Sequence, residues 1–251
     1  MKRNIYLNKE LSQIPGITYE YLKNDQSKKY PALTSQNIKA VHNYVTQQSS
    51  YSSLPSENFV EKYFSDHKGD VSVSSVITKI ILIDTVDSTN LKPLLGKNYY
   101  LEIANRIIKY NIEDDIMKGN PIGNKFRSIA EIPIPKGKRK SKTDYNLFIF
   151  TSKYITRVNE YSYKGNNYSI MDTVVKDYLP IYEAHFAKNM GCDIASRLTT
   201  KSLNKMHSEF DYDAYCRLLG DIVSEIGDGI DRNMLDHFLW FSFKKEAVED
   251  K

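Results

Sequence analysis

Apolar residues recur at helical spacing in most of the segments into which proline, glycine and serine divide this chain. The pattern is present in residues 35–47, 98–118, 212–226 and 231–248, and it is the pattern of helices that bury one face. In the first segment the apolar stripe consists of Ile38, Val41, His42 and Val45. In the second, Leu101 lies on the expected inner side and Gly119 is the expected stop, and in the last the residues expected to face inwards are Leu235, Phe238, Leu239 and Trp240. Strand-like alternation is scarce by comparison. We therefore predict a mainly α-helical protein that forms a single multi-helical domain.

Two parts of the chain are harder to assign. Residues 1–30 are polar and rich in tyrosine and show little periodicity, so we expect an N-terminal arm or irregular lead-in before a helical domain over 31–251. The segment 71–90, VSVSSVITKIILIDTVDSTN, mixes β-branched residues with helical spacing, and its length favours a helix. Ser56 is expected to cap a short helix. The buried side of that helix would carry Phe59, Val60, Tyr63 and Phe64.

Composition narrows the class of protein. With 251 residues, 41% of them hydrophobic, the chain can bury a core without help. Its two cysteines, Cys192 and Cys216, are too few for a disulfide framework and predict reduced thiols in a cytoplasmic protein. The most apolar run is interrupted by Lys79 and is too short to cross a membrane, so we expect no membrane partner.

Positive charge is concentrated in one part of the chain. The formal net charge is only +4, but residues 125–142 hold seven basic residues and a single acid, whereas 207–251 hold eleven acids and five bases. Such a separation suits a basic face that binds a phosphate backbone, and a solvated basic loop is the alternative. The predicted phosphate contacts are Lys136, Lys138, Arg139, Lys140 and Lys142.

Several common sites are missing from the sequence. It contains no GxxxxGK[ST] loop, no GxGxxG after a strand, no HExxH and no GxSxG. The five histidines have no metal-ligand spacing with one another or with the cysteines. We therefore expect neither a metal nor a cofactor.

The remaining candidate for chemistry is a lysine followed by an aspartate, Lys153 and Asp172, in SKYITRVNEYSYKGNNYSIMDTVVKDYLP. A lysine amine can form a Schiff base with C1′ of a sugar, and a carboxylate can stabilise the positive charge that grows on the sugar as a base departs. The ordinary alternatives are a helix N-cap for Asp172 and a solvated helical residue for Lys153.

Around this pair the sequence resembles the helix-hairpin-helix DNA glycosylase superfamily. In that family a helix and a short loop precede a catalytic aspartate that begins the next helix, and MDTVV at 171–175 is similar to this motif. LDHFLW at 235–240 resembles the final helix of distant relatives. The resemblance implies a two-lobed helical arrangement, Asp172 as the catalytic aspartate and Lys153 near the Schiff-base lysine of the bifunctional members. The family's leucine-proline-glycine-x-glycine turn has no counterpart before Lys153.

These observations lead to a functional hypothesis. We expect a DNA glycosylase that flips a damaged or modified base out of duplex DNA and hydrolyses its N-glycosidic bond, with the basic residues at 136–142 holding the backbone. The divergent hairpin suggests a specialised substrate, such as a modified base in foreign, for example phage, DNA. The alternatives are a non-catalytic helical nucleic-acid-binding module and a helical protein–protein interaction domain.

Overall fold

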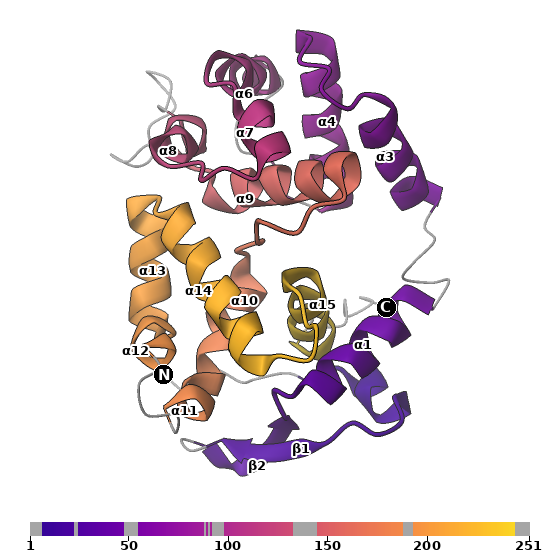
Figure 1. The fold of residues 1–251 in the computed structure, drawn as a ribbon, viewed down its shortest axis with the longest axis vertical. Helices are drawn as coiled ribbons and strands as arrows, with labels where there is room; N and C mark the ends of the chain where they lie inside the picture. Colours follow the sequence, from indigo (N-terminus) through magenta and orange to yellow (C-terminus); the bar gives the residue numbers. More distant parts are fainter. Residues whose placement is uncertain are drawn as a thin grey trace, which may run out of the picture. The chain divides into compact units, whose positions relative to one another are not determined.

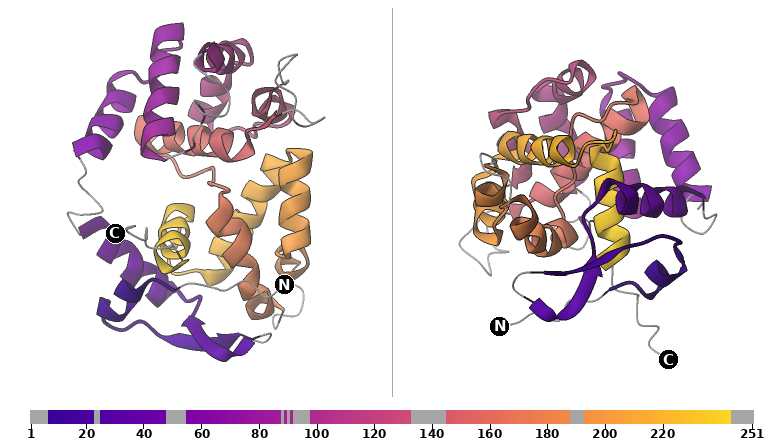
Figure 2. Two further views of the ribbon diagram at one scale, coloured as in Figure 1. Left: turned by 180° about the vertical axis from the view of Figure 1, so that it is seen from behind. Right: turned by 60° about the horizontal axis from the view of Figure 1, so that its bottom comes forward.

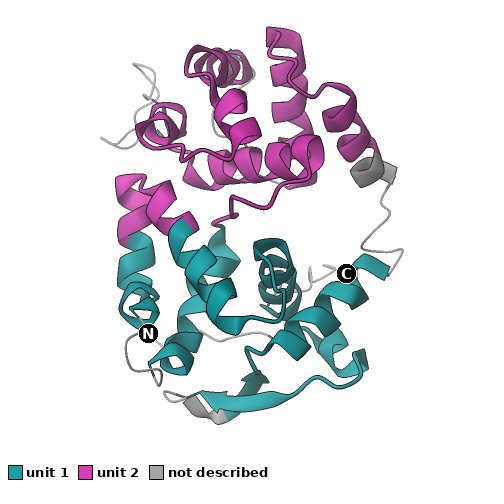
Figure 3. Ribbon diagram, in the orientation of Figure 1, with its two compact units in different colours: residues 1–52, 172–204, 217–251 teal, residues 53–171, 205–216 magenta. Residues whose placement is uncertain are grey.

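The protein is mainly helical, as the apolar spacing predicts, and its chain divides into two compact units. In the computed structural model, residues 7–22, 25–47, 55–87, 89, 91, 98–132, 145–187 and 193–243 are described. Unit 1 comprises residues 1–52, 172–204 and 217–251, and unit 2 comprises 53–171 and 205–216 (Figure 3). The chain therefore leaves unit 2 after Met171 and re-enters unit 1 at Asp172.

Unit 1 combines a hairpin with helices from both ends of the chain (Figure 1). Its elements are η1 (Lys9–Gln13), β1 (Tyr19–Leu22), β2 (Asp25–Pro31), α1 (Ser35–Gln47), α10 (Thr173–Tyr178), η3 (Leu179–Tyr182), α11 (Glu183–Phe186), α12 (Ile194–Arg197) and α15 (Arg232–Phe243). Two further helices, α13 (Thr200–Glu209) and α14 (Tyr212–Ile226), each contribute residues to both units.

The lead-in before α1 is an ordered hairpin rather than only irregular chain. Strands β1 and β2 pair antiparallel, with Tyr21 opposite Lys29 and Glu20 opposite Tyr30. Leu22 and Tyr30 are buried, and the Tyr182 hydroxyl donates to the Pro31 carbonyl oxygen at 2.7 Å. These contacts fix the hairpin to the rest of unit 1, and short strands with so little apolar alternation give a weak signal in sequence.

The core of unit 1 forms where α1 and α10 pack against α15. Figure 2 shows α1 beside α15 in both views. On α15, Leu235, Phe238 and Leu239 are buried, in agreement with the predicted inner face. Residue Tyr178 at the end of α10 stacks on Phe243 with the ring centroids 4.6 Å apart. Aromatic pairs of this kind add stability beyond their buried area.

Unit 2 is a helical assembly with one two-residue strand pair. Its elements are α3 (Pro55–Asp66), α4 (Val73–Val86), α6 (Asn98–Lys109), α7 (Ile112–Lys118), α8 (Asn124–Ala130), β3 (Glu131–Ile132), β4 (Tyr145–Asn146), α9 (Phe148–Arg157) and the π-helical turn η2 (Val158–Ser162). Helix α4 packs on α3, α6 and α9, and η2 packs on α3 and α7.

Three residues of unit 2 differ from the sequence expectation, namely Asn111, Phe59 and Leu101. The helix predicted over 98–118 is interrupted by Asn111, whose φ of 53° ends the regular helix before α7 begins. Gly119 then stops α7 with a φ of 67°, as predicted for a glycine C-cap. Phe59 and Leu101, which were expected to face inwards, are 57% and 48% exposed.

Candidate active site

Asp172 occupies the N-cap of α10, the position that its motif predicts. Its Oδ1 atom accepts a hydrogen bond from the Val175 amide at 2.9 Å, and its carbonyl oxygen accepts from the Lys176 amide at 3.1 Å. The backbone at Asp172 is extended, with φ −116° and ψ −171°, as at a typical N-cap. No residue in the described part of the chain donates to Oδ2. One oxygen is therefore fixed by the helix, and the half-buried carboxylate keeps a second acceptor.

The segment that leads into Asp172 is held by tyrosine hydroxyl groups from α14. The Tyr212 hydroxyl accepts from the Ser169 amide at 3.3 Å and donates to the Ser169 carbonyl oxygen at 3.0 Å. The Tyr215 hydroxyl donates to the Ile170 carbonyl oxygen at 2.5 Å. These bonds supply the hydrogen-bond partners that the buried backbone groups of this segment need. The backbone two and three residues before Asp172 is therefore fixed by side chains.

The next residue, Met171, is held by α9. Its amide donates to Ser152 Oγ at 3.2 Å, and the same hydroxyl group donates to the Ile149 carbonyl oxygen at 2.9 Å. Both Ser152 and Met171 are fully buried. Ser152 directly precedes Lys153 in the sequence, so the serine of the SKYITR motif positions the chain just before the aspartate.

Tyr212 lies in an aromatic cluster of unit 2. Its ring stacks on Phe126 with centroids 4.4 Å apart and meets Phe148 edge to face at 6.0 Å. Burial raises the pKa of the Tyr212 phenol well above its ordinary value, and the nearby Cys216 thiol adds to the shift. The phenol therefore remains a hydrogen-bond donor to Ser169 at any ordinary pH.

Lys153 serves a local contact in unit 2. Its ammonium group donates to the carbonyl oxygen of Asp87, the C-cap of α4, at 2.8 Å. One turn later on α9, Arg157 pairs with the Asp87 carboxylate at 3.3 Å and with Glu160 at 2.9 Å. A cation at a helix C-terminus satisfies unpaired carbonyl groups and the helix dipole. Lys153 belongs to unit 2 and Asp172 to unit 1, and each has partners within its own unit.

The basic residues from Lys136 to Lys142 lie outside the described residues. Their connection, 133–144, starts and ends at paired strands, because Ile132 of β3 pairs with Tyr145 of β4. The Arg127 side chain pairs with Glu131 at 2.8 Å beside this point, and that contact lowers the pKa of Glu131.

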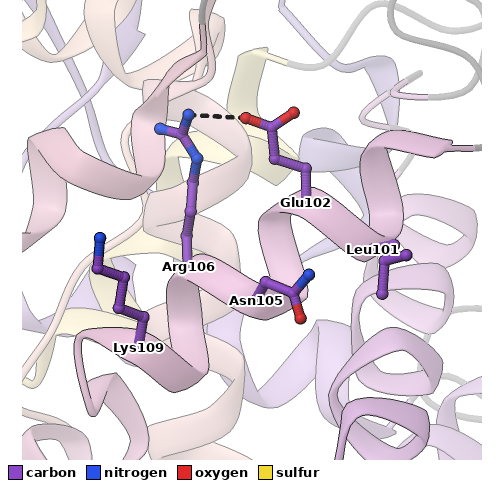
Figure 4. Close-up of a pocket in the computed structure, with 5 residues that line it drawn as sticks. All are labelled: Leu101, Glu102, Asn105, Arg106 and Lys109. Carbon is purple, nitrogen blue, oxygen red and sulfur yellow. Dashed lines mark hydrogen bonds and ion pairs between the residues drawn. The ribbon is translucent and has the colours of Figure 1, made fainter.

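A shallow hollow of about 290 Å³ lies along the polar side of α6 (Figure 4). It is lined by Leu101, Glu102, Asn105, Arg106 and Lys109. The Arg106 guanidinium is already engaged, because it pairs with Glu102 at 2.7 Å and donates to the carbonyl oxygens of Ser128 and Glu131. We therefore regard Arg106 as a structural tie between α6 and the end of α8 rather than a ligand-binding residue.

A buried ionic network in unit 2 was not foreseen from the sequence. Lys79 and Glu113 are 0% and 2% exposed and lie 2.7 Å apart. The Tyr154 hydroxyl donates to Glu113 at 2.7 Å, and Lys79 also donates to the Asp70 carbonyl oxygen at 3.3 Å. Lys79 interrupts the most apolar run of the chain, and that position was the available signal that it would need a buried acidic partner.

The described residues contain no cluster of three metal-ligating side chains. Cys216 is a buried free thiol, and Cys192 lies outside the described residues. Within the ranges that the structure describes, none of the helices has the length and apolar character to cross a bilayer.

A family model described as an N-terminal domain, HI_0787_N, matches residues 35–162, just over half of the 251 residues. The chain belongs to the HI_0787_N family. The HI_0787_N match begins at Ser35, where α1 begins, and ends at Ser162, where η2 ends. It includes Lys153 and the basic connection 133–144 and stops before Asp172. No curated protein and no solved structure matches the chain.

Proposed function

We propose that this chain is an N-glycosylase that removes a damaged or modified base from duplex DNA, with Asp172 as the catalytic carboxylate. The observation that carries the proposal is the state of Asp172: one oxygen caps α10, and the other accepts no hydrogen bond from the described residues. A carboxylate held in this way is oriented through one oxygen, and its second oxygen can still accept a hydrogen bond. It can stabilise positive charge or accept a proton from water.

The segment 169–171, which directly precedes Asp172, supports the same role. A catalytic group must be held close to its productive geometry by residues that are themselves fixed. Tyr212, Tyr215 and Ser152 together engage the backbone of the three residues before Asp172. Those three supports are buried and come from helices α14 and α9. The backbone that leads into Asp172 is thus held by hydrogen bonds within unit 2, and Asp172 itself is held by the helix that it caps in unit 1.

The reaction requires no cofactor. After the nucleotide is flipped from the duplex, the bond between C1′ and the base nitrogen breaks and its electron pair leaves with the base. Asp172 stabilises the oxocarbenium-like sugar, and water adds to C1′ as the carboxylate accepts a proton from it. The departing base takes up a proton, so the products are a free base and an abasic site. The basic residues at 136–142 would hold the phosphate backbone.

The contacts of Lys153 favour a monofunctional enzyme. A Schiff-base lysine must present a free amine to C1′, whereas the Lys153 ammonium group donates to the Asp87 carbonyl oxygen at 2.8 Å. We therefore propose that Lys153 supports the end of α4 and that strand cleavage does not follow base release. Borohydride reduction during turnover tests this directly: no covalent adduct with DNA is expected, and a trapped adduct lost in Lys153→Met would restore the lysine to the chemistry.

The experiment that tests the main proposal is a screen for base release. Purified protein is incubated with duplexes that carry deaminated, oxidised, alkylated or enzymatically modified bases, and abasic sites are revealed by alkaline cleavage. Release from at least one duplex supports the proposal. If the wild-type protein binds the duplexes with steep salt dependence and releases no base from any of them, it is a non-catalytic nucleic-acid-binding module instead.

A further inference from the structure

The outer face of the β1–β2 hairpin combines exposed aromatic rings with the cation of Lys29. Tyr19 and Tyr21 are 40% and 52% exposed, and because they are two residues apart on β1 they point to the same face of the hairpin. Lys29 on β2 lies opposite Tyr21 in the strand register, and its ammonium group is 5.3 Å from the centre of the Tyr21 ring.

The opposite face of the hairpin is directed to the core. Leu22 is 8% and Tyr30 is 1% exposed, and Glu20 is half-buried on the same side. The exposure of Tyr19 and Tyr21 is therefore not explained by the small size of the hairpin. The hairpin already has an apolar inner face, and its outer face carries two large aromatic side chains in addition.

Charge identifies the kind of partner that suits this face. No carboxylate of the described residues lies within ion-pair distance of Lys29. A protein-binding face would be expected to exclude such a cation from its centre. Exposed rings beside a lysine with no carboxylate partner among the described residues suit single-stranded nucleic acid, because each base can stack on a ring while the ammonium group contacts a phosphate.

We propose that Tyr19, Tyr21 and Lys29 form a binding face for a short single-stranded segment of nucleic acid. This face is separate from Asp172 and its function goes beyond base release, since it needs no modified base and no catalysis. Side chains two residues apart on a strand are spaced by about 6.6 Å, so the two rings can receive two bases of one strand. The Lys29 ammonium group then neutralises one phosphate.

The test is anisotropy of a fluorescent oligothymidylate titrated with the full chain. The variants are Tyr19→Val/Tyr21→Val, which replaces the rings by residues that also favour strands, and Lys29→Glu. We expect the double variant to bind on the order of tenfold more weakly. Lys29→Glu should weaken binding and reduce the slope of log K against log salt by about 0.7, as expected for one phosphate of a single strand.

The matched control is Lys68→Glu. Lys68 also lies over a tyrosine ring, 5.0 Å from the centre of Tyr163, but that ring is half-buried and belongs to unit 2. This variant should bind the oligonucleotide like the wild type. The proposal is overturned if the wild type does not bind, if the hairpin variants bind as tightly as the wild type while their circular dichroism is unchanged, or if Lys68→Glu weakens binding as much as Lys29→Glu does.

Discussion

The hydroxyl group of Tyr212 bonds to both backbone groups of Ser169, accepting from its amide at 3.3 Å and donating to its carbonyl oxygen at 3.0 Å. Ser169 has no strand partner, and the Tyr212 hydroxyl group satisfies both of its backbone groups in place of a strand. The buried segment 168–171 of unit 2 is therefore held without a strand partner up to the residue before Asp172. The geometry of the candidate active site depends on residues 40 or more positions away in the sequence.

Tyr212→Phe should destabilise the protein by about 1–3 kcal/mol, because it leaves the buried amide and carbonyl group of Ser169 without partners. The free energy of unfolding in urea, at an unchanged m-value, measures the loss. Tyr110→Phe is the control: its hydroxyl bonds to none of the residues that the structure describes, and the expected change is within about 0.5 kcal/mol. Equal stability of the two variants would mean that the Tyr212 bonds do not hold the segment.

Lys79→Met should be among the most destabilising single substitutions in unit 2. It leaves the Glu113 carboxylate buried without its cation, a loss of about 3–5 kcal/mol for a broken buried pair. Lys79→Met/Glu113→Gln should be more stable than Lys79→Met alone, because the amide removes the unpaired charge and still accepts from the Tyr154 hydroxyl. Chemical denaturation of wild type, both single variants and the double variant completes the cycle. Additive losses in the double variant would contradict a coupled pair.

The stability contributed by Tyr100 should fall in alkaline solution. Burial, followed by the hydrogen bond to Asp84 and its negative charge, raises the pKa of Tyr100 to about 12, against about 10 in an unfolded chain. The folded state thus favours the protonated phenol, so its contribution is complete below pH 10 and is lost as the pH rises towards 12. The difference in unfolding free energy between wild type and Tyr100→Phe should shrink over that interval. A difference independent of pH would mean that the phenol ionises normally.

Much of the helical framework can be predicted from periodicity. Residues 35–47 and 212–226 form helices with the expected bounds, and length correctly favours a helix over 73–86. The end of the helix at Asn111 and the hairpin β1–β2 are harder to predict. They depend on local backbone conformation and tertiary contacts rather than on apolar spacing. Phe59 and Leu101 fall on the expected stripe and yet remain exposed, since periodicity alone does not say how wide the covered stripe is.

The candidate site was predictable only in part. The N-cap role of Asp172 follows from its sequence context, and the structure confirms that cap. The supports from Tyr212, Tyr215 and Ser152 could not be found, because a tyrosine that bonds to a distant backbone has no local sequence signature. The contact of Lys153 with the Asp87 carbonyl oxygen could not be predicted either, because it joins residues 66 positions apart.

The central claim is that the Asp172 carboxylate acts chemically and not only as a helix cap, and Asp172→Asn separates these roles. Asparagine caps a helix as well as aspartate does, whereas Asp172→Ala should cost about 1 kcal/mol. On a duplex that the wild type processes, single-turnover base release by Asp172→Asn should be slower by about 100-fold or more, with unfolding free energy and duplex affinity unchanged. Release at the wild-type rate by Asp172→Asn would contradict the claim and leave Asp172 as a cap.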